Sequence, residues 1–202
     1  MRQGPAICLS RFRLRQNTGL VRVLAAALLT ASSAVPLLAQ VPQPSEYEVK
    51  AAYLLNFGKF VRHTKPQPPL SSFDICLLGH DDMGRTIDDL ASSESINNLP
   101  VHVRRIPDVT DSKTCAIVFI STNEGNRIRE DLAILAGSDV LTVSDAPNFL
   151  DRGGMVQFVL ISNHVRFAIN LNPVNRARLV LSSELLRVAS SVTGKPQTGE
   201  LQ

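Results

Sequence analysis

The segment whose spacing comes closest to a catalytic motif is GHDDMGRT, Gly79–Thr86, which follows an apolar run and spells G-x-x-x-x-G-R-T. A P-loop with this spacing holds phosphates through backbone N–H groups and a lysine. Here Arg85 stands where the lysine belongs, and Asp81 and Asp82 bring two negative charges into the loop. These charges oppose anion binding. The segment therefore predicts a strand-to-helix turn in which Asp81 or Asp82 caps the helix.

The other candidates for chemistry are isolated along the chain. The histidines have neither the helical nor the finger-like spacing of metal ligands. They are His63, His80, His102 and His164. No G-x-S-x-G segment provides the sharp turn that presents a serine nucleophile. We therefore predict no metal, no cofactor and no catalytic residue, and a protein that is not an enzyme.

A glycine pair, Gly153–Gly154, precedes a long apolar segment, MVQFVLISNHVRFAIN. A glycine pair that cradles a phosphate opens a helix, whose first N–H groups face the anion. This pair opens a strand instead, because residues 155–161 and 165–170 have the pattern of a hairpin joined around Asn163. The pair is interpreted as a structural turn, with a positive φ angle or a close approach to a neighbour.

Apolar periodicity divides the rest of the chain into alternating helices and strands. Ser45 is the expected cap of an amphipathic helix whose apolar stripe is Val49, Ala52, Tyr53, Phe57, Phe60 and Val61. Strands are predicted at FDICLLG, PVHVRRI, CAIVFIS and DVLTVSD, and helices at residues 82–90, 124–137 and 182–192. This order predicts an α/β fold: a single three-layer sandwich with a mixed β-sheet, helices on both faces and a β-hairpin in the C-terminal half.

The N-terminal segment has the composition of an export signal. Residues 1–39 contain five arginines, no acidic residue and the short apolar core VLAAALLTA. We predict a signal peptide over residues 1–39, cut after Ala39, and a linker over 40–46. One domain over 47–193 and a disordered tail over 194–202 follow. Cleavage after Ala34 and retention as a membrane anchor are the alternatives.

The segment after the signal is expected to be one soluble domain. With 44% hydrophobic and 19% charged residues, the chain has the composition of a globular protein. Residues 40–202 hold 16 of the 21 basic residues and all 18 acidic ones, and this net charge of −2 argues against nucleic acid as a partner. No later segment is apolar enough to span a bilayer, so no direct membrane insertion is expected after cleavage.

Two cysteines remain once Cys8 leaves with the signal. Cys76 and Cys115 each lie in an apolar run that is expected to be a strand. An even pair in an oxidising compartment is a disulfide candidate. The alternative is two buried thiols that never meet, because the sequence does not give their separation.

Seven short segments follow one another in a recognisable order. They are KAAYLLNFGKFV, CLLG, C-x-I-V-F-I-S, VLTVSD, F-x-x-x-GGM-V-x-F, VRFAIN and SSELLRVA, and they run from about Glu48 to Ala189. Together they resemble the YfiR family of small exported bacterial proteins. The resemblance implies an α/β domain in the periplasm that has no catalytic activity and that forms homodimers in some members. It also implies a partner, the periplasmic part of an inner-membrane diguanylate cyclase, whose repression lowers cyclic di-GMP and restrains biofilm formation.

The sequence departs from the family pattern in three places. Leu150 and Gln157 stand where the namesake has a second cysteine pair, so redox control through that pair is not expected. RHTKP replaces the Trp-Pro that commonly ends the first helix. Ala168 replaces a glutamate before Ile169. This change of charge weakens transfer of the partner's identity from the family.

The preferred function is regulation by contact with a membrane signalling protein. Apolar residues around the hairpin are the candidate partner interface, and the alternative is that they belong to the core. They are Val156, Ala168 and Val174.

Two other functions stay open. A module that binds a small ligand in another membrane signalling or transport system would use a crevice at the carboxyl ends of the strands. Gly79, Ser121 and Asp145 lie at these ends. An exported hydrolase would need a nucleophile in the same crevice.

Overall fold

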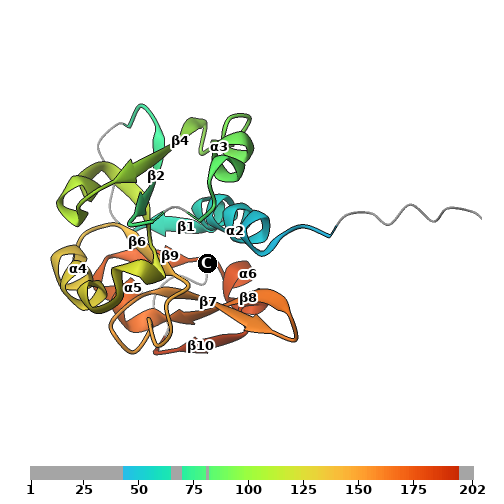
Figure 1. The fold of residues 1–202 in the computed structure, drawn as a ribbon. Coiled ribbons are helices and arrows are strands. Elements are labelled where there is room, and N and C mark those ends of the chain that lie inside the picture. Colours follow the sequence, from blue (N-terminus) through green and yellow to red (C-terminus); the bar gives the residue numbers. More distant parts are fainter. Residues whose placement is uncertain (1–42, 65–69, 81, 196–202) are drawn as a thin grey trace, which may run out of the picture. The chain divides into compact units, whose positions relative to one another are not determined.

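Figure 1 shows the computed structural model of the chain, which describes residues 43–64, 70–80 and 82–195. The predicted signal peptide with its cut after Ala39, the residue Asp81 and most of the predicted tail lie outside the described residues. Helix α2 (Glu46–Phe60) begins at the last residue of the predicted linker.

Helix α2 begins with a complete capping box, as Ser45 predicted. The Ser45 hydroxyl accepts a hydrogen bond from the Glu48 N–H at 3.2 Å, and the Glu48 carboxylate accepts one from the Ser45 N–H at 2.6 Å. The predicted apolar stripe is only partly right, since Phe57 is buried but Val49 and Tyr53 are half-buried. The residues that the helix buries are Lys50, Ala51, Leu54, Leu55, Phe57 and Gly58.

Eight strands form one mixed sheet in the order β10-β8-β7-β6-β5-β2-β4-β3. Their bounds are β2 (Phe73–Leu78), β3 (Ser95–Ile96), β4 (Leu99–Ile106), β5 (Cys115–Ile120), β6 (Leu141–Ser144), β7 (Val156–Ile161), β8 (His164–Asn170) and β10 (Ser191–Thr193). Strands β4, β2, β5, β6 and β7 run parallel, as do β8 and β10, whereas β7–β8 and β3–β4 are antiparallel. The predicted mixed sheet is confirmed. Strands β1 (Val61–His63) and β9 (Leu179–Leu181) form a separate antiparallel ribbon.

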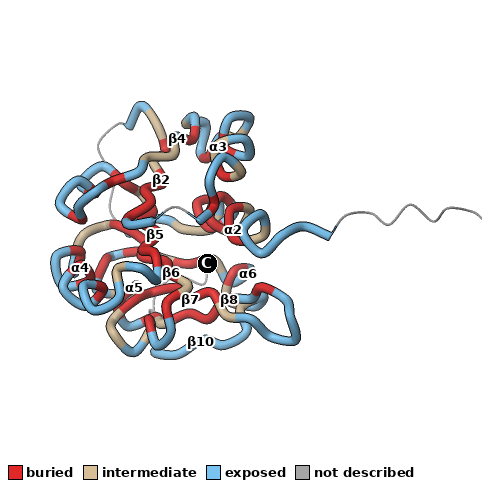
Figure 2. The backbone as a smooth tube through the Cα atoms, in the orientation of Figure 1, coloured by how far each residue is buried: buried red, intermediate tan, exposed pale blue. Residues whose placement is uncertain are grey.

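Helices cover both faces of the sheet, which confirms the predicted sandwich (Figures 1 and 2). Along β5, Ile117 and Phe119 belong to one core and Val118 and Ile120 to the other. The first core lies under α2, α3 (Arg85–Ala91), α5 (Leu171–Arg176) and α6 (Ser183–Val188). The second lies under the 3-10 helix η1 (Val109–Thr114) and α4 (Ile128–Leu135), and a further 3-10 helix, η2 (Thr122–Arg127), precedes α4.

Strands β7 and β8 form the predicted hairpin. Ser162 and Asn163 make its two-residue loop with φ angles of 49° and 61°, the left-handed geometry that matches the twist of paired strands. On the side facing α2, the ring centroids of Phe158 and Phe167 lie 5.9 and 5.0 Å from that of Phe57. These aromatic contacts hold the hairpin against α2.

The glycine pair forms a turn that has both expected features, a positive φ angle at Gly153 and a close approach to a neighbour at Gly154. Gly153 has a φ angle of 105°, in the region that favours glycine. At Gly154, the ring of Phe149 packs where a β-carbon would stand. The Gly154 N–H donates to the Phe149 carbonyl at 3.0 Å, and this bond closes the turn before β7.

Gly154→Ala should lower the free energy of unfolding by about 1–3 kcal/mol, because the new methyl group overlaps the buried ring of Phe149. Gly153→Ala is the matched control, since open space surrounds its β-carbon position and only backbone strain opposes the change. In a Phe149→Leu background the loss from Gly154→Ala should shrink, while that from Gly153→Ala should not change. Urea unfolding measures both, and an unchanged loss from Gly154→Ala in that background would contradict the steric explanation.

Candidate functional site

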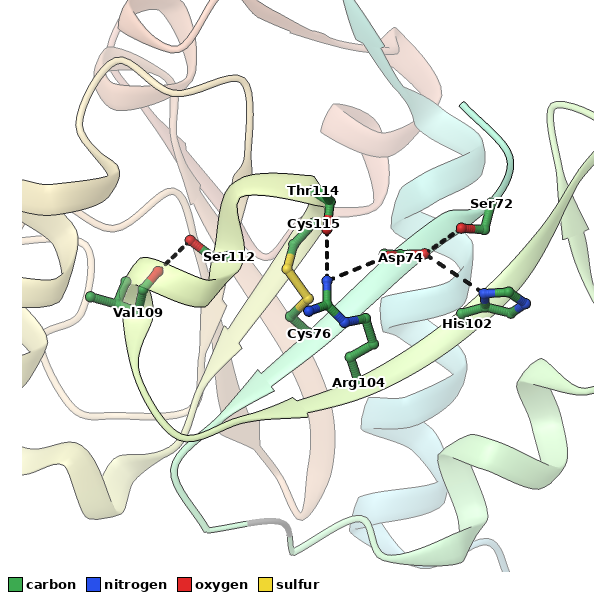
Figure 3. The surroundings of a disulfide bond; sticks show 9 residues. All are labelled: Ser72, Asp74, Cys76, His102, Arg104, Val109, Ser112, Thr114 and Cys115. Atoms are coloured by element: carbon green, nitrogen blue, oxygen red, sulfur yellow. Dashed lines mark hydrogen bonds and ion pairs between the residues drawn. A yellow bond between two sulfur atoms is a disulfide. The ribbon is translucent and has the colours of Figure 1, made fainter. Parts of the chain in front are cut away.

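Cys76 on β2 and Cys115 on β5 are joined in a disulfide, with their Cα atoms 5.8 Å apart (Figure 3). Both residues are buried. The pairing of β2 with β5 skips Ala116, a shift of one residue in the register. Because alternate residues of a strand face opposite ways, this shift turns Cys115 into the same core as Cys76.

Polar side chains surround the disulfide (Figure 3). Asp74 accepts a hydrogen bond from Ser72 at 2.7 Å and lies 3.5 Å from the Arg104 guanidinium. Arg104 also donates to the Thr114 hydroxyl at 2.7 Å, which links β4 to the residue before Cys115. These contacts are structural. Among the residues that the structure describes, no group of three or more His, Cys, Asp or Glu side chains could hold a metal ion.

The three residues expected at a partner interface lie inside the domain. Val156, Ala168 and Val174 are all buried, and the most exposed of them, Ala168, is only 7% exposed. Val156 and Ala168 lie within the sheet, where β10 pairs with β8 at Ala168. The predicted interface is corrected here, because a partner reaches none of these side chains without opening the fold. Charged substitutions at these positions are expected to destabilise the domain.

The segment that resembles a P-loop forms no site with the histidines. Helix α3 follows Gly84 and has no side-chain cap, so Asp82 does not cap it as expected. Asp82 instead lies 3.4 Å from His80. His63 contacts the Asp139 carbonyl, and His102 and His164 lie on β4 and at the hairpin tip.

The crevice residues follow their strands as predicted but have different surroundings. Ser121 is buried, and its hydroxyl accepts a hydrogen bond from the Asn123 N–H at 3.3 Å. The side chain of Glu124 lies against Gly79. Asp145, directly after β6, lines a cavity.

The cavity has a volume of about 200 Å³ and lies between α2, the end of β6 and the hairpin. Lys50 is 4% exposed, yet its ammonium lies 2.7 Å from Asp145 Oδ2 and 2.6 Å from Glu46 Oε1. These ion pairs join the start of α2 to a carboxylate 95 residues later in the chain. The lining residues are Glu46, Lys50, Asp145, Phe158, Val159, Leu160 and Val165.

The polar wall of the cavity has a net negative charge. Burial alone would lower the pKa of Lys50, but its hydrogen bonds and ion pairs with Asp145 and Glu46 outweigh burial and raise the pKa above its usual value. Lys50 is therefore protonated at neutral pH, and one ammonium faces two carboxylates. Asp145 Oδ1 is buried and accepts no hydrogen bond from the described residues. The wall has one acceptor and one negative charge in excess.

Exposed apolar side chains lie at the start of α2 and at the hairpin tip, and one of them, Leu160, lines the cavity. Leu160 is 58% exposed and Tyr47 is 41% exposed, and the Tyr47 ring centroid lies 5.4 Å from the Lys50 ammonium. Ile161, which follows Leu160 at the hairpin tip, is also exposed. Tyr47, Leu160 and Ile161 are referred to below as the rim.

The arrangement suits binding. Lys50, the one amine of the lining, is held protonated by its ion pairs with Asp145 and Glu46, so its lone pair is not available for nucleophilic attack. Apolar walls with a few convergent polar groups are typical of ligand sites. Sequence reasoning found Asp145 but missed Lys50 and Glu46, because such a pair four residues apart on a helix is ordinarily exposed.

A second buried carboxylate, Asp131, lies on α4 at the other face of the sheet. Its Oδ2 accepts no hydrogen bond from any residue in the described part of the chain. Burial raises the pKa of Asp131, and the charge of Arg127 opposes that shift. Asp131 is thus a buried charge that disfavours the folded state near neutral pH.

Asp131→Asn should raise the free energy of unfolding by about 1 kcal/mol near neutral pH, because the amide keeps the shape and removes the buried charge. The raised pKa means that wild-type stability from this group is fully present below the unfolded value of 3.8 and is lost as pH rises through the folded value. The advantage of the variant should therefore vanish near pH 3.8. Chemical denaturation of the wild type and Asp131→Asn between neutral pH and pH 3.8 tests this prediction. Glu130→Gln, at an exposed residue of the same helix, is the control. A gain that does not change with pH would rule out the buried charge as its cause.

Within residues 43–64, 70–80 and 82–195, no helix has the length and apolar character needed to cross a bilayer.

A family model described as YfiR/HmsC-like matches residues 47–190. No curated protein matches the chain. A conserved domain protein from Vibrio cholerae O1 biovar eltor is 8% identical, with a TM-score of 0.49 over 74% of this chain and 60% of that one. The ABC domain in complex with L-Trp from Streptococcus pneumonia is 10% identical, with a TM-score of 0.45 over 60% of this chain and 55% of that one. The chain thus spans less than two thirds of either structure, and neither likeness bears on function. The family match covers most of the described domain, and this chain belongs to the YfiR/HmsC-like family.

Proposed function

We propose that this protein is a non-enzymatic regulator in the periplasm, which binds the periplasmic part of a membrane diguanylate cyclase and lowers cyclic di-GMP. Membership of the YfiR/HmsC-like family is the observation that carries the proposal. The export-like composition of residues 1–39 and a disulfide between Cys76 and Cys115 support a location outside the cytoplasm. The ion pairs that hold Lys50 against both carboxylates of the cavity support binding over catalysis.

We assign the partner contact to the rim instead of the buried residues of the hairpin. Tyr47, Leu160 and Ile161 leave apolar side chains in solvent, and Leu160 lines the cavity together with the carboxylates of Glu46 and Asp145. Aromatic and aliphatic anchors with a polar border are the usual composition of a binding surface. The negative charge favours a cyclase segment that presents lysine or arginine beside an apolar side chain. A homodimer is the alternative occupant of this surface.

Deletion of the gene should raise intracellular cyclic di-GMP, and the wild-type protein should restore the low level. The double variant Tyr47→Ala/Ile161→Ala should fail to restore it, because loss of two anchors weakens a typical interface by about tenfold or more. Neither residue lines the cavity. Ile134→Ala on α4, an exposed apolar residue on the other face, is the matched control and should repress normally.

Binding is then measured between each purified variant and the periplasmic segment of the cell's membrane diguanylate cyclases, with the oligomeric state followed by light scattering. Unchanged cyclic di-GMP after gene deletion would remove the proposed regulation. Full repression by a folded Tyr47→Ala/Ile161→Ala protein would remove the rim from the interface, and a loss of self-association in that variant would assign the rim to a homodimer.

A second candidate is a small-ligand-binding module in another membrane signalling or transport system. The cavity beside Lys50 favours it, since its lining combines apolar and charged groups. This second function would be favoured if the purified protein binds a small ligand and deletion of its gene leaves the cyclic di-GMP level unchanged.

A further inference from the structure

We infer that the cavity between α2 and the hairpin binds a small aliphatic monoamine, a compact hydrocarbon that ends in one protonated amine. The inference shares Leu160, Glu46 and Asp145 with the proposed cyclase contact, but it is argued from the cavity lining and does not depend on a cyclase. It assigns a ligand class to Glu46, Asp145 and the apolar wall of the hairpin.

The size and composition of the cavity define the body of the ligand. A dry cavity of about 150 Å³ accepts a molecule the size of benzene, so about 200 Å³ accommodates a body of about five carbon atoms with an amine. Phe158, Leu160 and Val165 present only hydrocarbon to it. Drug-sized sites are larger, about 300–1,000 Å³, so the cavity suits a small body.

The charges of the polar wall define the head group of the ligand. Lys50 already pairs with both carboxylates, at 2.6 and 2.7 Å, so it has little capacity to attract an anion. An anionic ligand would bring a third negative charge next to Glu46 and Asp145. A ligand ammonium instead balances the wall, with two positive charges against two negative ones.

The hydrogen-bonding capacity of the wall points to the same head group. An ammonium has three N–H donors and no acceptor. Asp145 Oδ1 lacks a hydrogen-bond donor among the described residues, so a carboxylate of the lining has an unused acceptor. The Glu46 carboxylate is 40% exposed, so it is accessible at the mouth of the cavity and accepts a second N–H. A hydroxyl has one donor and no charge, so it pairs with fewer acceptors of the wall and does not balance its negative charge.

The test compares three probes with the same branched body: 3-methylbutylamine, 3-methylbutan-1-ol and 3-methylbutanoate. Each is titrated into the isolated protein and followed by NMR. The amine should bind at least about tenfold more tightly than the alcohol or the acid, and its shifts should centre on amides of residues 46–50 and 158–165. Equal affinity for the three probes, or shifts centred elsewhere, would overturn the inference.

Variants separate the charge from the shape of the site. Glu46→Gln should bring the affinity for the amine down at least about fivefold, toward that for the alcohol. Glu48→Gln is the matched control, because it makes the same change on the same helix at a residue that does not line the cavity. Leu160→Trp fills the mouth and should weaken the amine and the alcohol alike.

Thermal unfolding shows that each variant is folded before it is titrated. Wild-type affinity in folded Glu46→Gln would refute the carboxylate's role, and wild-type affinity in folded Leu160→Trp would refute the location. None of these measurements involves a cyclase, so a failure here leaves the proposed regulation standing. Likewise, a failure of the cyclase experiments leaves this inference standing.

Discussion

Lys50→Met is expected to lower the free energy of unfolding by about 3–5 kcal/mol, because it removes one partner of a buried ion pair and leaves Asp145 uncompensated. Lys50 is 4% exposed, and the Asp145 side chain only 17%. Methionine keeps the apolar stem of lysine, so the loss reports the charge more than the packing. Guanidinium unfolding near neutral pH measures it.

A second substitution identifies the cause of this loss. A second change, Asp145→Leu, should cost less in the Lys50→Met background than in the wild type, since the pair is already broken. A small deficit in Lys50→Met, or full additivity of the two substitutions, would show that the ion pair does not hold α2 to β6.

The free energy of unfolding of the wild type should fall at high pH, when Lys50 loses its proton. The pKa of Lys50 is raised in the folded state, so its stabilisation is fully present below the unfolded value of 10.5. That stabilisation is lost as the pH rises through the folded-state pKa.

The double variant Cys76→Ala/Cys115→Ala should lose about 3–4 kcal/mol of stability, and its Tm should fall by on the order of 10 °C. The two cysteines are 39 residues apart, and the loop that they close restricts the unfolded chain. Alanine avoids placing an unpaired hydroxyl in the buried site, which serine would do.

Reductant provides the matched control for the disulfide. Wild-type protein unfolded in the presence of dithiothreitol should approach the stability of the double variant, and the double variant should not respond to dithiothreitol. Wild-type stability that is the same with and without reductant would mean that the bridge adds nothing to the fold.

Local sequence patterns were sufficient for the fold class and the longer elements. They missed α5 and the strands β1, β3, β9 and β10, and the helix predicted over 182–192 ends at Val188. The capping box of Ser45 depends on hydrogen bonds that span three residues, and the apolar runs that became β2 and β5 need only neighbours of like character. The turn at Gly153–Gly154 was also readable, because a strand pattern follows it directly. Each of these features is decided within a few residues, where the chain's own stereochemistry limits the choices.

The burial of residues around the hairpin could not be predicted from local sequence patterns. Val156 and Ala168 have the composition of either a core or an interface, and their burial followed from α2 on one side and from β10 beside β8 on the other. Likewise, the alternation of β5 would place Cys115 on the face of Ile117. The skipped residue Ala116, which appears only in the pairing with β2, turns the cysteine to the opposite core.

The sequence by itself determined the α/β class, the order of the longer helices and strands and the turn at Gly153–Gly154, because short-range hydrogen bonding and apolar periodicity decide these. Only the tertiary structure decided that Lys50 is buried, that Asp145 meets it from 95 residues away and that the two cysteines face each other. Those contacts join segments distant in the chain, and their energies depend on burial and register that exist only once the sheet has formed.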